Sequence, residues 1–183
     1  LKRVLLQVLE EFDHKHLNLD LPYFERQIPT SENVARVLWD KLQAQPDIGT
    51  LQRLSLYEDE DLCADLTAEA GPEVASVTRR YSFTAVHDGH RGHTWDLFVS
   101  VHGPIDRETG MVTDIVALDH LLKERVLVPF DGRDLRIVLA TPSVTGEYLA
   151  KAVWDRIASA IPAGTLQLVK LVQTRDLFYE YAG

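Results

Sequence analysis

An internal repeat constrains the fold of this chain more than any other feature of its sequence. Residues 37–42 lie over residues 152–157 when the chain is compared with itself, so that Trp39 coincides with Trp154. Further matches continue along both copies at nearly constant spacing, with residue numbers that differ by 115 to 118. Because tryptophan is rare, such matches are hard to obtain by chance, and similarity at a fixed spacing is typical of repeats. We therefore predict a tandem duplication.

The two copies differ in extent. Residues 77–183 form a whole second copy, whereas residues 1–66 match only its later part. Residues 67–76 include Gly71 and Pro72 and indicate a linker between the copies. By analogy with the second copy, we expect roughly 40 further residues before Leu1 to complete the first.

The composition excludes several classes of function. The chain has 183 residues, 45% of them hydrophobic, and a formal charge of -9, which disfavours binding to nucleic-acid phosphates. No apolar run approaches the ~20 residues needed to cross a bilayer. The single cysteine, Cys63, excludes an internal disulfide and fits the reducing cytosol. We expect a cytoplasmic protein with no nucleic-acid or membrane partner.

Hydrophobic periodicity predicts an α+β fold. For the second copy it predicts the order ββααββ, with strands 78–86 and 94–102, helices 114–127 and 145–160, and strands 165–173 and 176–182. For the first copy it predicts helices 1–11 and 31–45, and strands 51–57 and 61–66. Each unit would place two helices on one face of an antiparallel sheet. Open sheet edges invite pairing, so we expect a homo-oligomeric ring of three chains or a multiple.

Two features of the first copy are candidate sites for proton transfer and ligand binding. Asp13 directly precedes His14 after the first helix, where a carboxylate can orient an imidazole and raise its basicity. Thr30, Ser31 and Glu32 open the second helix, whose free backbone N–H groups can bind a polar ligand edge. A turn and an ordinary helix cap are the structural alternatives.

Glu58 closes the predicted strand 51–57. If its side chain points inward, its carboxylate matches the planar N–H edge of a guanidine-like heterocycle. A solvent-exposed surface glutamate is the alternative.

Three histidines of the second copy, His87, His90 and His93, lie within seven residues and indicate an open zinc site of the catalytic type. Residues two apart share a face of a strand, but His90 and His93 are three apart. They would converge only through a turn or bulge, so a segment without metal is the alternative.

Taken together, these motifs resemble those of the 6-pyruvoyl-tetrahydropterin synthase and 6-carboxytetrahydropterin synthase family, which has the tunnelling fold. The segments that look like the later half of such a unit are 13–18, 21–24, 29–33 and 57–58. The segments that look like the first half of another unit are 83–87, 92–95 and 110–114.

The resemblance implies a zinc-dependent lyase that converts 7,8-dihydroneopterin triphosphate to 6-carboxy- or 6-pyruvoyl-tetrahydropterin. It assigns Asp13 and His14 to proton relay, Glu58 to the amino-pyrimidine edge of the pterin, and Thr30, Ser31 and Glu32 to further pterin contacts. The zinc ligands and catalytic cysteine of the first copy would precede Leu1, and Cys63 stands at another position. We favour the carboxy product, which is used in deazapurine (queuosine) synthesis.

The second copy departs from the family pattern. Arg91 replaces the first histidine of a His-Gly-His motif, Asp131-Gly132 replaces the Asp-His pair, and Gln173 replaces the counterpart of Glu58. These losses predict that only the first copy is catalytic and that the second completes the ring. The alternative hypothesis is a non-catalytic pterin-binding or scaffold protein of the same fold.

Overall fold

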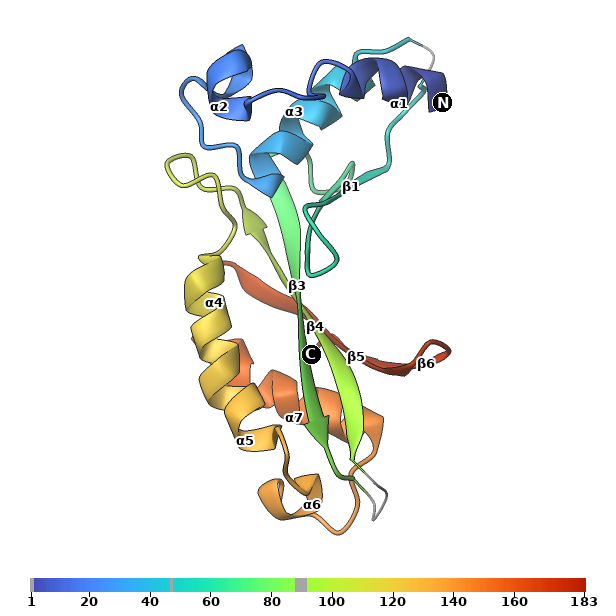
Figure 1. Ribbon diagram of the computed structural model, residues 1–183, viewed down its shortest axis with the longest axis vertical. Coiled ribbons are helices and arrows are strands. Elements are labelled where there is room, and N and C mark those ends of the chain that lie inside the picture. The colour runs from blue at the N-terminus through green and yellow to red at the C-terminus, as the bar shows by residue number, and fades with distance from the viewer. Residues whose placement is uncertain (1, 47, 88–91) are drawn as a thin grey trace. The chain divides into compact units, whose positions relative to one another are not determined.

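The computed structural model describes residues 2–46, 48–87 and 92–183. Its strands form a six-stranded antiparallel sheet in which the described strands pair in chain order, from β1 to β6 (Figure 1). The described chain contains α-helices as well as this antiparallel sheet, so the predicted α+β class is confirmed. In the described part of the chain, no helix has the length and apolar character needed to span a membrane.

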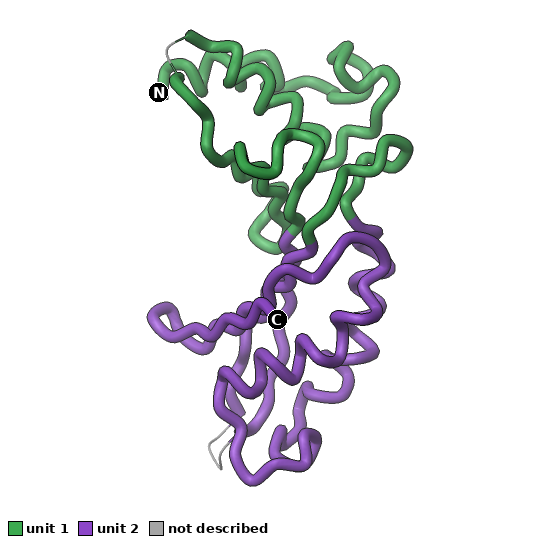
Figure 2. Tube along the Cα trace, turned by 180° about the vertical axis from the view of Figure 1, so that it is seen from behind, with its two compact units in different colours: residues 1–77, 102–112 green, residues 78–101, 113–183 purple. Residues whose placement is uncertain are grey.

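The chain divides into two compact units, coloured separately in Figure 2. The first contains residues 1–77 and 102–112, and the second contains residues 78–101 and 113–183. This division by contacts differs from the division by sequence similarity, because residues 102–112 belong to the second copy in sequence but pack within the first unit.

The first unit has two main helices and a hairpin. Its elements are α1 (Lys2–Leu9), α2 (Leu17–Asp20), the 3-10 turn η1 (Pro22–Phe24), α3 (Ser31–Gln43), β1 (Arg53–Tyr57) and β2 (Leu62–Thr67). Helix α3 contacts α1, β1 and β2. Val8, Leu38 and Leu42 form one buried cluster of this unit, against which Leu54 and Leu56 of β1 pack. Removal of this apolar surface from water stabilises the helix on the hairpin.

The second unit contains most of the long hairpin and the remaining helices. Its elements are β3 (Val74–Ala85), β4 (His93–Pro104), α4 (Ile115–Leu122), the π-helical turn η2 (Lys123–Leu127), α5 (Val128–Phe130), α6 (Leu135–Val138), α7 (Gly146–Ile157), the 3-10 turn η3 (Ala158–Ala160), β5 (Thr165–Thr174) and β6 (Leu177–Tyr181). The ends of β3 and β4 extend into the first unit. Helix α7 contacts β5 and β6.

Capping residues explain where the helices begin. The Asp114 carboxylate accepts hydrogen bonds from the first free N–H groups of α4. Thr30 and Thr145 cap α3 and α7, and each hydroxyl accepts the N–H three residues later. The two helices begin at residues whose numbers differ by 115, the same spacing that the repeat shows in the sequence.

The helix predicted over residues 114–127 is not a single α-helix, because its backbone hydrogen bonding changes along its length. It is α-helical as far as Leu122 and continues as a π-helical turn before α5. Pro129 has no N–H to donate to the carbonyl four residues earlier, that of Arg125, and the Arg156 side chain donates to this carbonyl instead, at 3.2 Å.

Candidate functional site

The start of α3 brings together the predicted binding residues of the first copy. The Ser31 hydroxyl donates to the Glu58 carboxylate at 2.6 Å. Glu58 follows β1, and its backbone N–H donates to the carbonyl of Leu62 across the turn that leads into β2. Its carboxylate is exposed, so the inward orientation is not observed, and one acceptor group faces solvent beside the helix start.

Glu32 is buried beside this pair, with 4% of its surface exposed. Its Oε1 accepts the backbone N–H of Val112 at 3.0 Å. Burial raises the pKa of Glu32, and the nearby charge of Glu58 acts in the same direction, whereas the hydrogen bond from Val112 opposes this shift. The site therefore places two carboxylates at one helix start, one buried and one exposed.

The Thr30 hydroxyl makes two hydrogen bonds within the protein, one as donor and one as acceptor. It donates to the carbonyl oxygen of Gly110 at 2.6 Å and accepts the N–H of Asn33 at 3.2 Å. The Asn33 side chain donates to the carbonyl of Ile28 at 2.8 Å, which fixes the segment that enters the helix. Thr30, Ser31, Glu32 and Glu58 therefore lie close together at the start of α3, and their role as pterin-binding residues stays a prediction.

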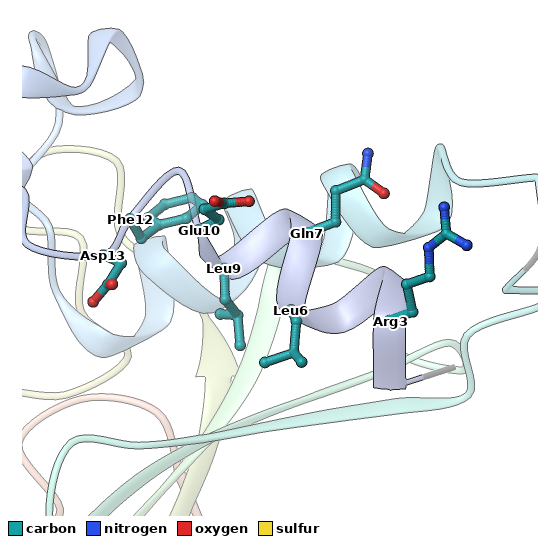
Figure 3. Close-up of a pocket in the computed structure, with 7 residues that line it drawn as sticks. All are labelled: Arg3, Leu6, Gln7, Leu9, Glu10, Phe12 and Asp13. Atoms are coloured by element: carbon teal, nitrogen blue, oxygen red, sulfur yellow. The ribbon is translucent and has the colours of Figure 1, made fainter.

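Asp13 and His14 lie in the turn after α1. The His14 Nε2 and the Asp13 carboxylate are 3.8 Å apart, and the two side chains are 94% and 69% exposed. Asp13 also borders an open groove of about 900 Å³ along α1, shown in Figure 3. Among the described residues, no hydrogen bond or ion pair joins Asp13 and His14 to Glu58.

The backbone at His14 adopts a conformation that favours glycine. Its φ is 54°, in the left-handed region, where a side chain is strained. The aligned position of the second copy is Gly132, with a φ of 68°. The φ angle at this position is therefore left-handed in both copies, but the first copy carries an imidazole there. Strain of this kind is often retained at functional sites.

The predicted zinc ligands are only partly described, because His90 lies outside the described residues. The rings of His87 and His93 have centroids 6.4 Å apart, and both pack against Trp95. A tetrahedral zinc with Zn–N bonds of about 2.1 Å would bring two imidazole centres to roughly 5 Å. The His93 Nε2 instead contacts the backbone carbonyl of Gln173 at 2.7 Å. Within residues 2–46, 48–87 and 92–183, no three metal-ligating side chains cluster, so the described residues alone do not fit a zinc site.

Cys63 lies in β2 and is buried. Burial, together with the charge of Asp65, raises the pKa of its thiol to about 11. The thiolate is the nucleophilic form of cysteine, so this environment does not favour nucleophilic chemistry at Cys63.

Sequence reasoning missed the loop that supports the site. Gly110 and Val112 contact Thr30 and Glu32 across 80 positions of sequence. No local sequence pattern indicates which distant helix the loop around Gly110 contacts.

The fold and the site define an α+β protein in which a helix start and the end of a neighbouring strand present carboxylates and a hydroxyl. The family model described as 6-pyruvoyl tetrahydropterin synthase matches residues 1–69 and 77–183. The chain belongs to the 6-pyruvoyl tetrahydropterin synthase family.

Individual proteins that are similar to this chain carry names of the same family. The 6-pyruvoyl tetrahydrobiopterin synthase of Pongo abelii is 31% identical over 134 residues, which cover 60% of this chain and 92% of that protein. The Drosophila melanogaster protein of the same name is 30% identical over 136 residues, covering 60% of this chain and 80% of its own length. The structure of Caenorhabditis elegans 6-pyruvoyl tetrahydropterin synthase matches with a TM-score of 0.56 and 23% identity, over 60% of this chain and 96% of that one. This last similarity supports the fold.

The buried Glu32 predicts a measurable pH dependence of stability. Because its pKa is raised in the folded state, the folded protein binds this proton more tightly than the unfolded chain. The resulting stabilisation is complete below the unfolded pKa and is lost as the pH rises through the folded value. Glu32→Gln removes this loss and retains an acceptor for Val112. Its free energy of unfolding relative to the parent should therefore increase as the pH rises from below 4.5, the ordinary pKa of a glutamate, through the raised folded pKa.

Urea denaturation at a series of pH values measures this difference. Glu108→Gln is the matched control, because Glu108 is exposed on the neighbouring loop. A parallel pH dependence for the parent and Glu32→Gln would contradict the prediction.

Proposed function

We propose that this chain is a pterin synthase that acts on 7,8-dihydroneopterin triphosphate and forms 6-carboxy- or 6-pyruvoyl-tetrahydropterin. The observation that carries the proposal is the Glu58 carboxylate, oriented by the Ser31 hydroxyl at the start of α3 and next to the buried Glu32. The family match supports the assignment, and two relatives are named as 6-pyruvoyl tetrahydrobiopterin synthases.

The chemistry of the pterin explains why this arrangement suits it. The amino-pyrimidine edge of a pterin presents a ring N–H and an exocyclic amino group side by side. A carboxylate can accept both groups, and such charge-assisted pairs are stronger than neutral hydrogen bonds. Glu58 would accept this edge, while Ser31 holds the carboxylate in place. Thr30 and Glu32 would complete the binding segment at the helix start.

Proton transfer is assigned to His14, with Asp13 as its partner. An imidazole titrates near neutral pH and can remove and return protons at a substrate side chain. The Asp13 carboxylate, 3.8 Å from Nε2, would help to orient the ring. The left-handed backbone at His14 supports a functional reason for keeping a histidine where the second copy has glycine.

The proposal confines catalysis to the first copy. The second copy carries Gly132 and Gln173 in place of the imidazole and the carboxylate. The shared spacing of α3 and α7 supports a tandem duplication, in which the second copy would complete an oligomeric ring. A cytoplasmic location belongs to the same proposal.

Zinc dependence is also part of the proposal and rests on the family resemblance. His87, His90 and His93 are proposed as ligands of a zinc ion in the second copy, separate from the zinc of the catalytic first copy, and the described pair His87 and His93 does not by itself form a zinc site. When bound, zinc would act as a Lewis acid toward oxygen atoms of the substrate. Metal analysis of the purified protein measures its zinc content directly.

Turnover of 7,8-dihydroneopterin triphosphate tests the assignment through Glu58. Glu58→Gln removes the charge at nearly constant shape and should lower kcat/KM by about 10- to 150-fold, the usual loss for a hydrogen bond to a charged group. Gln173→Ala, at the aligned position of the second copy, is the matched control and should leave turnover near the parent value. Equal turnover of the parent and Glu58→Gln would refute the assignment.

A non-catalytic pterin-binding protein is the second candidate. It is favoured by the solvent exposure of Asp13 and His14, which have no hydrogen bond or ion pair to Glu58 in the described part of the chain. Pterin binding that depends on Glu58, without any turnover, would identify this function.

A further inference from the structure

A loop of the second sequence copy, residues 106–112, is hydrogen-bonded to the start of α3 in the first copy. The Gly110 carbonyl accepts the Thr30 hydroxyl at 2.6 Å, and the Val112 N–H donates to Glu32 at 3.0 Å. Gly110 and Val112 are both buried. All four residues belong to the first compact unit, in which Figure 2 groups residues 102–112 with residues 1–77.

The loop has its own internal framework. The Asp106 carboxylate accepts the N–H groups of Glu108 and Thr109, at 3.0 and 2.8 Å, and the Thr109 hydroxyl at 3.0 Å. The Asp106 backbone also exchanges hydrogen bonds with Gly110 and Met111. These contacts lower the pKa of Asp106, so the carboxylate remains charged as the acceptor at the centre of the loop. A loop held in this way presents the Gly110 carbonyl and the Val112 N–H in fixed positions.

Gly110 permits the close approach of the loop to α3. Its φ is 73°, and a Cβ atom there would lie 2.4 Å from Nδ2 of Asn33 and 3.1 Å from Oγ1 of Thr30. Asn33 is itself held by the carbonyl of Ile28. A side chain at position 110 would therefore push the loop away from the helix start or displace the segment around Thr30.

We propose that the loop of residues 106–112 positions the pterin-binding segment, and that Thr30 acts through this loop rather than by touching the ligand. The single hydroxyl hydrogen of Thr30 is donated to Gly110, and its oxygen also accepts from the helix. Ser31 and Glu58 remain as the groups that face the ligand. This inference rests on the function proposed above and deepens it by assigning a positioning role.

A pair of glycine substitutions tests the proposal. Gly110→Ala and Gly71→Ala both place alanine at a left-handed φ, 73° and 80°, but nothing lies within 4 Å of the Cβ at position 71. The two variants thus share the backbone strain, and only Gly110→Ala adds a collision. Because small displacements of binding groups cost up to about 10²-fold, Gly110→Ala should raise KM for 7,8-dihydroneopterin triphosphate at least about tenfold. Its Kd for 7,8-dihydroneopterin, measured by fluorescence titration, should rise in parallel, and Gly71→Ala should change neither value more than about twofold.

Three further variants extend the test, and the two at Thr30 keep it decisive if Gly110→Ala folds poorly. Thr30→Val removes the hydroxyl, whereas Thr30→Ser retains both its hydrogen bonds. We expect Thr30→Val to raise KM and Thr30→Ser to restore the parent value. Asn33→Ala in the Gly110→Ala background removes the nearest colliding atom and should recover part of the lost affinity.

The outcomes separate the two proposals. If the parent binds and converts the pterin but Gly110→Ala behaves like Gly71→Ala, or Thr30→Val keeps the parent KM, the positioning role is overturned and the pterin function stands. If the parent protein neither binds 7,8-dihydroneopterin nor converts its triphosphate, the proposed function itself fails.

Discussion

Replacement of His14 by glycine is expected to lower pterin turnover by about 10²- to 10⁴-fold, the usual contribution of a general acid or base. The same change should leave the free energy of unfolding unchanged or raise it by up to about 1 kcal/mol, because glycine tolerates the left-handed backbone at this position. The substitution would therefore reduce activity without reducing the stability of the fold. Steady-state kinetics and urea denaturation of the same preparation measure both.

A neighbouring histidine provides the control. His16 is also exposed, and His16→Ala should retain turnover close to the parent value. If His14→Gly retained full turnover, proton transfer by His14 would be excluded. If His14→Gly lost turnover together with several kcal/mol of stability, the loss would reflect damage to the turn rather than to catalysis.

Truncation of Phe130 to alanine should destabilise the second unit by about 3–5 kcal/mol. Its side chain is fully buried at 0% exposure, and its ring centroid lies 5.7 Å from that of Phe83. The Arg156 guanidinium lies over the ring, 4.6 Å from its centroid. Loss of the ring would leave a cavity and remove both contacts. Chemical denaturation followed by circular dichroism measures the change in the free energy of unfolding.

The matched control for this core substitution is Phe178→Ala. Phe178 lies on β6 and is 50% exposed, so the same change of side chain should cost far less stability than at position 130. Equal losses for the two variants would contradict the packing described around Phe130.

Hydrophobic periodicity predicted the main helices and strands because their apolar residues recur on one face. The predicted helices 114–127 and 145–160 begin where Asp114 and Thr145 cap α4 and α7, whose first free N–H groups these short side chains satisfy. The π-helical turn was missed because hydrophobic periodicity does not distinguish one π-helical turn from the α-helix that it continues. Short α6 was missed because four residues carry too little periodicity to distinguish a helix from a loop.

The candidate site was predicted in part. Thr30, Ser31, Glu32 and Glu58 were selected from their motifs, and the structure brings them together. The orientation of Glu58 could not be predicted, because it stands beyond the last paired residue of β1, where strand alternation no longer fixes the direction of a side chain. The contact of the 106–112 loop with α3 is tertiary and has no local signature.

The allocation of residues 102–112 to the first compact unit has a consequence for how this protein can change in evolution. A gene shortened to the first copy alone would encode α3 without the backbone groups that Thr30 and Glu32 bind. Loss of residues 102–112 would therefore remove backbone partners from the first unit, so selection that acts on α3 also acts on this distant segment.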